Sequence, residues 1–222
     1  SATFSADVSP PFYFFGGSMT KVEICNHALL KIGADTIASL DINQNDQEAV
    51  VQSAKLCNIF FNQALSEVLR TYKWNSALKR TQLTRLTETP AFKFQFKYQL
   101  PNDCIRVINV YDKKEAYDDR TQWVVEGRTI LCDYETVYLC YVHLPEDVNT
   151  LDSFVTKCVI QNLAIKLAVP MQLDQVMQNN LISEYNNVIL PEARSVDTLE
   201  NKYWEMEESD FLLSRYNESP LI

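Results

Sequence analysis

Apolar residues recur every three or four positions in the first third of the chain, a spacing that predicts helices. In the segment 22–32 they share one helical face, and Gly33 follows where a left-handed residue ends a helix. A second apolar stripe runs over 49–69 without Pro or Gly, and Asn45 or Asp46 can cap its start. The sequence therefore predicts a short helix and a long one, and the long amphipathic helix needs partner helices.

The hydrophobic period changes to two in the middle of the chain. From Phe92 to Tyr98 aromatic residues alternate with polar ones, which predicts a half-buried strand. Short β-branched or aromatic runs follow at 105–111, 122–125, 129–131 and 136–142. Gly127 lies in the hairpin turn expected between the second and third of these runs. Together they predict a small antiparallel sheet.

Helical spacing returns after the predicted sheet. Asp152 or Ser153 caps a third predicted helix, which Pro170 ends. A fourth helix over about 172–190 has weaker periodicity and many Gln and Asn residues, and Pro191 interrupts or restarts it. The predicted fold class is α+β: mainly a helical bundle of about four helices, with a small antiparallel β insertion and extended termini.

These patterns divide the chain into five parts. They are a flexible leader or arm (1–18), a helical pair (19–88), an antiparallel β insertion (89–144), a helical pair that completes the bundle (145–196) and an acidic tail (197–222). The leader has no Lys or Arg, so it does not resemble a secretory signal. It precedes Met19 and is either an expression remnant, a disordered arm, or an arm whose aromatic residues dock on a neighbouring subunit.

The charge of the chain limits its partners. The net charge is −9 and the pI is near 4.8, which argues against a surface that binds DNA through clustered cations. The segment 197–222 alone has seven acidic and two basic residues, interleaved with aromatic ones. Such a segment is typical of chains that order on binding. No run of about 18 apolar residues is present, so no membrane span is expected.

Residues that could support catalysis are few. The chain has two His and four Gly, and its six Cys are scattered without a CxxC pair, so we expect no metal site, no cofactor and no enzyme activity. The cysteines are expected to be buried, free thiols. One alternative remains, a small carboxylate-dependent hydrolase acting on cell-surface or cell-wall polysaccharide, since two carboxylates suffice for glycosidic cleavage. Its candidate residues are Asp118, Asp119, Glu126 and Asp133.

Several segments in a fixed order resemble one known family. They are 26–33 (NHALLKIG), 37–40 (IASL), the polar segment after it, the Ala-rich stretch closing at 70–75 (RTYKWN), 98–107 (YQLPNDCIRV) and 152–168. In order and spacing they resemble the head-to-tail adaptor proteins of tailed bacteriophages, the tail tubular protein A-like family. The resemblance covers roughly residues 22–194.

The resemblance implies a non-enzymatic virion protein of the phage neck, assembled in the host cytoplasm. Such a protein forms a homo-oligomeric ring, a dodecamer in that family, which joins the portal protein to the tail and extends the DNA channel. DNA would pass without sequence-specific contact, and the β insertion would face the tail nozzle or next tail component. C-terminal segments of the family reach the portal, so the portal-binding residues implied are Tyr203, Trp204, Met206, Phe211, Leu212, Leu213 and Tyr216.

A cationic cluster follows the long predicted helix and is the candidate subunit interface. Its residues are Arg70, Lys73, Trp74, Lys79 and Arg80. The cluster could touch DNA phosphates or the acidic tails of neighbouring subunits. We favour the second, because acidic and basic segments of identical subunits complement each other in a ring.

Overall fold

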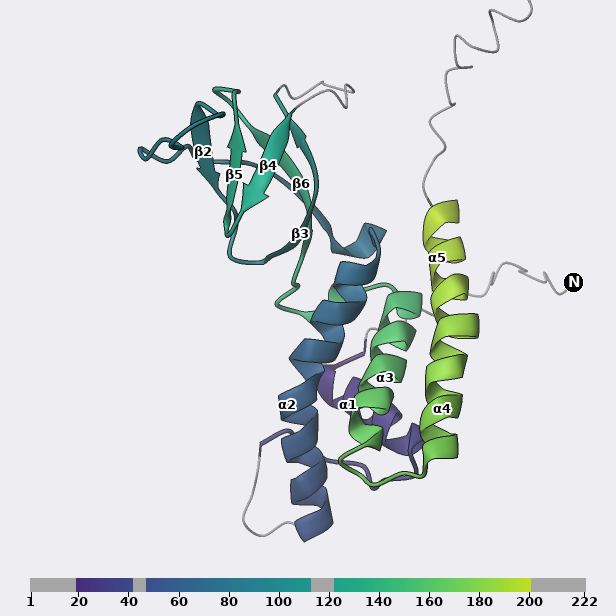
Figure 1. The fold of residues 1–222 in the computed structure, drawn as a ribbon. Helices are drawn as coiled ribbons and strands as arrows, with labels where there is room; N and C mark the ends of the chain where they lie inside the picture. The colour runs from purple at the N-terminus through teal and green to yellow at the C-terminus, as the bar shows by residue number, and fades with distance from the viewer. Residues whose placement is uncertain (1–18, 42–46, 113–121, 201–222) are drawn as a thin grey trace, which may run out of the picture.

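The structure is a computed structural model that describes residues 19–41, 47–112 and 122–200, and it has two parts (Figure 1). The helical body comprises the described residues of 19–71 and 144–200, and the β unit comprises those of 72–143. The helices are α1 (Lys21–Lys31), α2 (Glu48–Thr71), α3 (Ser153–Ala168), α4 (Gln175–Glu184) and α5 (Leu190–Leu199). The strands are β1 (Leu78–Gln82), β2 (Phe96–Gln99), β3 (Cys104–Tyr111), β4 (Trp123–Glu126), β5 (Thr129–Cys132) and β6 (Tyr138–His143).

Helix α1 has well-defined signals at both ends. At its start the Glu23 N–H donates to the Thr20 hydroxyl at 3.3 Å, and the Thr20 N–H donates to the Glu23 carboxylate at 2.7 Å, which is a capping box. At its end Gly33 has φ 73° and donates to the Leu30 carbonyl at 3.1 Å, while the next N–H reaches the Leu29 carbonyl at 3.0 Å. These paired bonds form a Schellman motif, and they confirm the predicted stop at Gly33.

Helix α2 starts later than predicted. Its N-cap is Gln47, which makes no side-chain capping bond, and the helix begins at Glu48. The expected caps Asn45 and Asp46 lie outside the described residues. The rest of the prediction is confirmed, since α2 continues unbroken to Thr71 and buries its apolar stripe.

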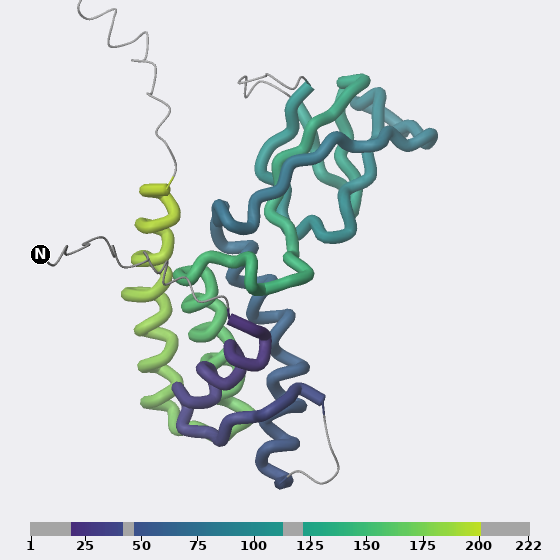
Figure 2. The backbone as a smooth tube through the Cα atoms, turned by 180° about the vertical axis from the view of Figure 1, so that it is seen from behind, coloured from purple at the N-terminus to yellow at the C-terminus, as the bar shows by residue number. Residues whose placement is uncertain are grey.

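Helix α3 is the centre of the helical body. The Asp152 carboxylate accepts the Phe154 N–H at 2.8 Å, which confirms the predicted cap. Buried side chains lie on all sides of α3 rather than on one stripe, as expected for a helix surrounded by others. Figures 1 and 2 show α3 between α2 and the α4–α5 rod, with α1 alongside.

The fourth helix continues through Pro191 instead of ending before it. Between α4 and α5 the chain makes a π-helical turn, η3 (Tyr185–Ile189), in which the Leu190 N–H donates to the Tyr185 carbonyl. A proline inside an α-helix lacks the N–H of the usual bond and crowds the carbonyl four residues before it. The wider π turn removes this conflict, so α4, η3 and α5 form one rod from Gln175 to Leu199.

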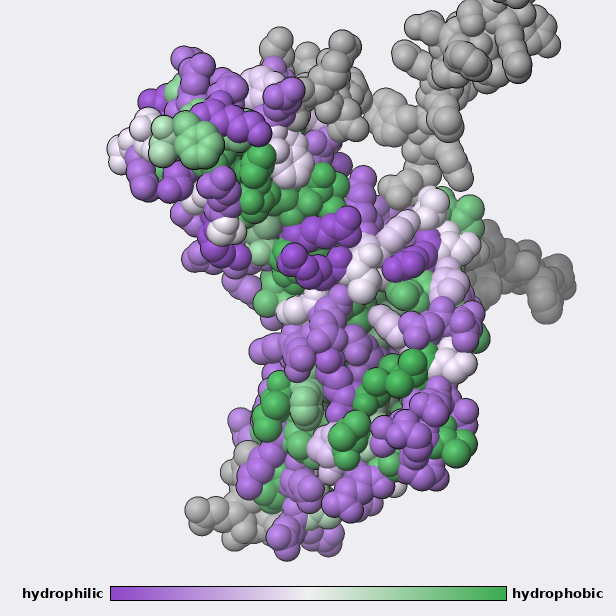
Figure 3. Space-filling model, viewed as in Figure 1, coloured by the Kyte–Doolittle hydropathy of each residue, from purple (hydrophilic) through white to green (hydrophobic). Residues whose placement is uncertain are grey.

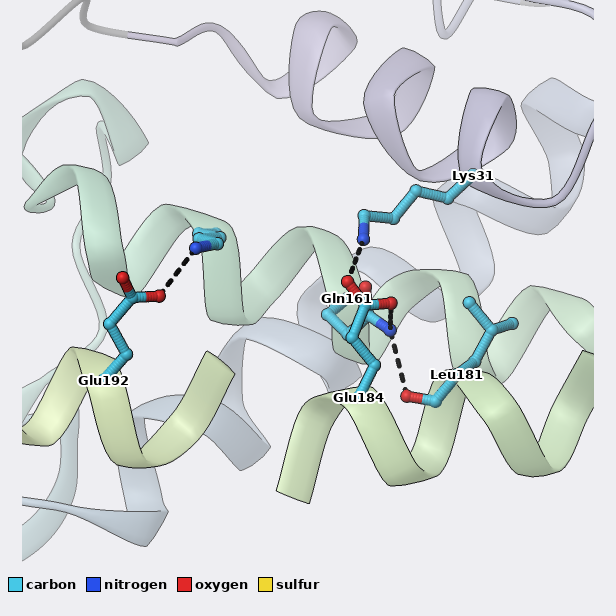
Figure 4. Close-up of polar contacts among 6 residues, drawn as sticks. Lys31, Gln161, Leu181, Glu184 and Glu192 are labelled. Atoms are coloured by element: carbon cyan, nitrogen blue, oxygen red, sulfur yellow. Dashed lines mark hydrogen bonds and ion pairs between the residues drawn. The ribbon is translucent and has the colours of Figure 1, made fainter. Parts of the chain in front are cut away.

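A buried amide connects this rod to α3 and α1 (Figure 4). Gln161 on α3 is 0% exposed, and its Nε2 donates to the Leu181 carbonyl at 2.9 Å and to the Glu184 carboxylate at 3.0 Å. The other oxygen of Glu184 pairs with the Lys31 ammonium at 3.1 Å. A second ion pair, Lys157 with Glu192 at 2.8 Å, joins α3 to α5. These contacts hold both halves of the rod, α4 and α5, against α3.

The β unit holds two sheets where the sequence predicted one. Both are antiparallel and three-stranded, in the orders β1-β6-β3 and β2-β5-β4. Strand β1 lies within 19–88, the part predicted to be a helical pair. Its short, charged sequence LKRTQ gives no clear strand signal, and pairing with β6 makes it a strand. The predicted hairpin turn is confirmed, since Glu126 pairs with Thr129 and Gly127 has φ 58°.

The predicted strand from Phe92 to Tyr98 was too long. Strand β2 covers Phe96–Gln99 because its partner β5 ends at Cys132. Beyond that point the Asp133 carboxylate, not a backbone carbonyl, accepts the Gln95 N–H at 2.9 Å. Phe92 is therefore outside the sheet and 82% exposed, not on a half-buried face.

Strand β6 joins the cores of the two parts. Leu139 and Tyr141 belong to the core between the two sheets, whereas Val142 belongs to the core of the helical body. Successive side chains of a strand point to opposite faces, so the sheet β1-β6-β3 has one face on each core.

Candidate interaction surface

The predicted cationic interface lies where α2 enters the β unit. Trp74 does not contribute to its surface, which corrects the expectation, because the side chain is 0% exposed. The Trp74 Nε1–H donates to the Val68 carbonyl at 2.8 Å, and the ring packs edge-on against Tyr72 with centroids 4.9 Å apart. Trp74 therefore stabilises the junction inside one subunit.

Arg70 also has a role within the subunit. Its guanidinium donates to the Ile105 carbonyl at 2.8 Å, and the Arg106 guanidinium on β3 donates back to the Arg70 carbonyl at 3.3 Å. The two arginines thus join the end of α2 to strand β3. Arg70 remains exposed, but an exchange there would disturb this junction as well as any partner contact.

Lys79 is paired with an acid of its own chain. Its ammonium lies 2.7 Å from the Asp103 carboxylate, which also accepts the Tyr141 hydroxyl at 3.1 Å. Burial alone would raise the pKa of Asp103, but the hydrogen bonds from Lys79 and Tyr141 outweigh burial and hold the pKa below its ordinary value. The positive charge of Lys79 is therefore largely balanced.

Lys73 and Arg80 are the two predicted interface residues that remain as exposed cations with no ion pair recorded in the described part of the chain. Arg80 lies on β1, an edge strand of its sheet. Charged side chains on an edge strand also prevent unwanted pairing with other strands. A structural role and a partner contact are thus both compatible with Arg80.

The end of α5 is fastened to this same junction. The Asn75 N–H donates to the Asp197 carboxylate at 2.8 Å, and the Asn75 amide donates to the Asp197 carbonyl at 2.6 Å. Burial is the main cause that raises the pKa of Asp197, partly opposed by the Asn75 N–H. The described chain ends at Glu200, so Asp197 is the residue of the predicted acidic tail that the structure fastens to this junction. The expected portal-binding residues 203–216 lie outside the described residues.

Of the residues considered for catalysis, the two that the structure describes, Glu126 and Asp133, are not assembled into a site. Asp118 and Asp119 lie outside the described residues. Glu126 is at the hairpin end of β4, whereas Asp133 follows the other end of β5. Four residues along a strand separate these positions by about 13 Å, more than the roughly 5–9.5 Å between the carboxyl groups of glycosidases. This pair does not support the hydrolase alternative.

One His and the Cys side chains serve the fold in the described residues. His143 Nδ1 lies 2.9 Å from the Ala77 carbonyl, and His27 is exposed on α1. All six cysteines are buried and free, as predicted. Burial raises the pKa of Cys158 to about 12, so this thiol is neutral and unreactive near pH 7. Over 19–41, 47–112 and 122–200 no group of three His, Cys, Asp or Glu side chains could hold a metal ion.

Comparison with known proteins adds no assignment. No protein-family model matches the chain, and no curated protein matches it. Among the described helices, none has the length and apolar character required to cross a bilayer.

Proposed function

We propose that the chain is a structural subunit of a head-to-tail adaptor ring of a tailed bacteriophage, which joins the portal to the tail and extends the DNA channel. The observation that supports this most is the unequal charge of the two parts. The described helical body has thirteen acidic and seven basic residues, a net charge of −6, whereas the described β unit has six acidic and eight basic residues, a net charge of +2.

This distribution suits a ring subunit in two ways. An acidic body can border a DNA channel without binding the duplex, because phosphates are repelled rather than neutralised. A cationic β unit can meet an acidic segment of a neighbouring copy, so that the same contact repeats around the ring. Asp197, the first residue of the predicted acidic tail, lies at the junction near Lys73, since Asn75 bonds both its carboxylate and its carbonyl.

The proposal is tested by the mass of the protein in solution, alone and with the portal ring encoded in the same genome. Light scattering should show a small species alone and a large complex after mixing. A protein that stays monomeric in both cases would contradict the proposal.

The cationic contact is tested by Lys73→Gln with Arg80→Glu, where position 73 is only neutralised because a carboxylate there would repel the nearby Asp197. Assembly at moderate salt should weaken, because the acidic partner segment would be repelled. Lys55→Glu is the matched control, an exposed cation on α2 away from the junction. Lys79 is a poorer target, since its reversal would also break the pair with Asp103. Equal assembly of the double variant and the control would refute this contact.

A further inference from the structure

The loop between β1 and β2 displays an aromatic side chain on a strained turn. The Phe94 N–H donates to the Phe92 carbonyl at 2.9 Å, and Lys93 between them has φ 73°. This is a γ-turn with positive φ, a rare and strained conformation for a residue with a side chain. The loop projects from the β unit in Figures 1 and 2, and Figure 3 shows hydrophobic surface at its tip.

Phe92 differs from the two aromatic residues that follow it at alternate positions. The Lys93 ammonium lies 5.3 Å from the Phe94 ring centre, and the Arg85 guanidinium lies 4.8 Å from the Phe96 ring centre. Phe92 is 82% exposed. One exposed apolar residue is ordinary, but an aromatic ring held outward by a strained turn is an observation that points to function.

A cavity on the helical body has the size to receive such a ring. It measures about 280 Å³ and lies between the start of α1, the middle of α2 and the connection from β6 to α3, which lie side by side in Figure 2. A closed apolar cavity of about 150 Å³ is enough for benzene, whereas this one is partly open and has polar side chains among its lining residues. Phe61, Leu65 and Pro145 line it, and the Lys21 ammonium lies 4.8 Å from the Phe61 ring centre, where it can also meet a second ring.

The acids at the edge of the cavity complement the cation beside Phe92, although Lys21 in the cavity lining is itself a cation. Lys93 stands beside Phe92 and is exposed, while Glu146 and Asp147 are exposed at the edge of the cavity. The same signs hold for the whole parts, since the β unit is cationic and the helical body acidic. A contact between the β-unit tip of one molecule and the body of another therefore brings opposite charges together.

We propose that Phe92 of one copy of this chain inserts into the Phe61–Pro145 cavity of the next copy, with Lys93 facing Glu146. The contact joins two different surfaces of identical subunits, so it propagates head to tail and closes into a ring when the rotation allows. The inference rests on the proposed ring assembly and names the contact between neighbours.

The role of the Phe92 side chain is tested by the variant Phe92→Ser. The matched control is Ile59→Ser, because Ile59 is 64% exposed on α2, away from the cavity. Phe92→Ser should raise the concentration at which copies associate, alone or on the portal ring, by about thirtyfold, the effect of an aromatic hot spot. Ile59→Ser should assemble like wild type. Equal thermal unfolding of both variants and wild type would show that the fold is intact.

A charge exchange tests the pairing of the two surfaces. Lys93→Glu and Glu146→Lys should each weaken association, and the double variant should recover most of it, because the pair is restored with reversed signs. Asp35→Lys, an exposed acid outside the cavity, is the control for adding positive charge to the body. Two single variants that weaken association without recovery in the double variant would overturn the pairing.

Three outcomes separate this inference from the proposed function. Wild-type rings that form equally with Phe92→Ser overturn the contact and leave the adaptor proposal standing. If Phe92→Ser loses binding to the next tail component while the mass of the subunit ring is unchanged, Phe92 is assigned to that partner, and the proposed contact between copies is overturned. A wild-type chain that never associates, alone or with the portal, contradicts both proposals.

Discussion

The helical body and the β unit achieve stability by different means. The body buries one large cluster, in which buried side chains lie around α3 and polar contacts such as Gln161 with Glu184 join neighbouring helices. The β unit has a smaller cluster between short strands, and polar groups such as Asp103 with Lys79 fix its turns. The comparison teaches that the body depends on one continuous core, while the β unit has more of its residues in turns and edges, where binding residues are common in proteins.

The most severe test of this comparison removes one core side chain from each part. Leu163→Ala in the body and Ile130→Ala in the β unit should each cost about 3–5 kcal/mol, since both side chains are fully buried. Because β6 contributes to both cores, both variants should show one unfolding transition, followed by circular dichroism and tryptophan fluorescence in denaturant. A separate early transition in Ile130→Ala alone would show that the β unit unfolds independently. Ile59→Ala, exposed on α2, is the control.

A smaller effect is expected from the buried amide that joins α3 to the rod. Gln161→Leu removes both hydrogen bonds from Nε2 and should cost about 1–2 kcal/mol, the net contribution expected of two such bonds. Gln175→Leu, on the exposed side of α4, should be nearly neutral. Denaturant midpoints of the two variants measure the difference. Equal midpoints would mean that the amide contributes no net stability.

A substitution in the turn at the tip of the β unit should stabilise the protein, in contrast to the two destabilising changes above. Lys93→Gly removes the strain of a positive φ and should raise the free energy of unfolding by about 1 kcal/mol. The same change removes the charge that faces Glu146 in the proposed contact, so association of copies should weaken. A variant that is more stable but assembles less well would show strain retained for function. A loss of stability would contradict the strained turn.

The smallest expected effect is a pH dependence of the stability, with opposite signs for Asp103 in the β unit and Asp197 in the helical body. The pKa of Asp103 is lowered, so its contribution to stability is present above its ordinary value near 3.8 and is lost as the pH falls through the folded value. The pKa of Asp197 is raised, so folding becomes more favourable as the pH falls through the raised value towards 3.8.

Melting temperatures of wild type, Asp103→Asn and Asp197→Asn across this acidic range measure the two contributions. The stability difference between wild type and Asp103→Asn should shrink on acidification. The stability of wild type relative to Asp197→Asn should increase on the same acidification. Slopes of the same sign for the two variants would contradict one of the assignments.

Structure set by neighbouring residues could be predicted from the sequence. Gly33 ends α1, Asp152 caps α3 and Gly127 turns the β4–β5 hairpin, each as expected. The apolar stripe of α2 and the six buried cysteines were also predicted. In each case the signal is a residue type with a local conformational preference, or a spacing that matches one helical face.

The candidate site was predicted only in part, because a side chain's partner depends on distant segments. The predicted interface residues are close together in the sequence, but three of them have roles within the subunit. Trp74 is buried, Lys79 is paired with Asp103, and Arg70 donates to the Ile105 carbonyl. None of these contacts has a local signal. The exposed ring of Phe92 was also missed, since an alternating pattern gave it the same expected environment as Phe96.

Strand β3 shows most clearly what only the tertiary structure decided. Its register with β6 shifts between Cys104 and Arg106 and again between Val107 and Asn109. The two shifts place Cys104, Val107 and Val110 against the β-unit core at intervals of three, which no period-two pattern predicts. The sequence by itself determined the presence of the helices, the end of α1, the start of α3 and the tight hairpin, because these depend on residues within a few positions. Pairing with β5 and β6, burial of Trp74 and passage of a helix through Pro191 depend on segments far apart in the chain, so they were decided only when the chain folded.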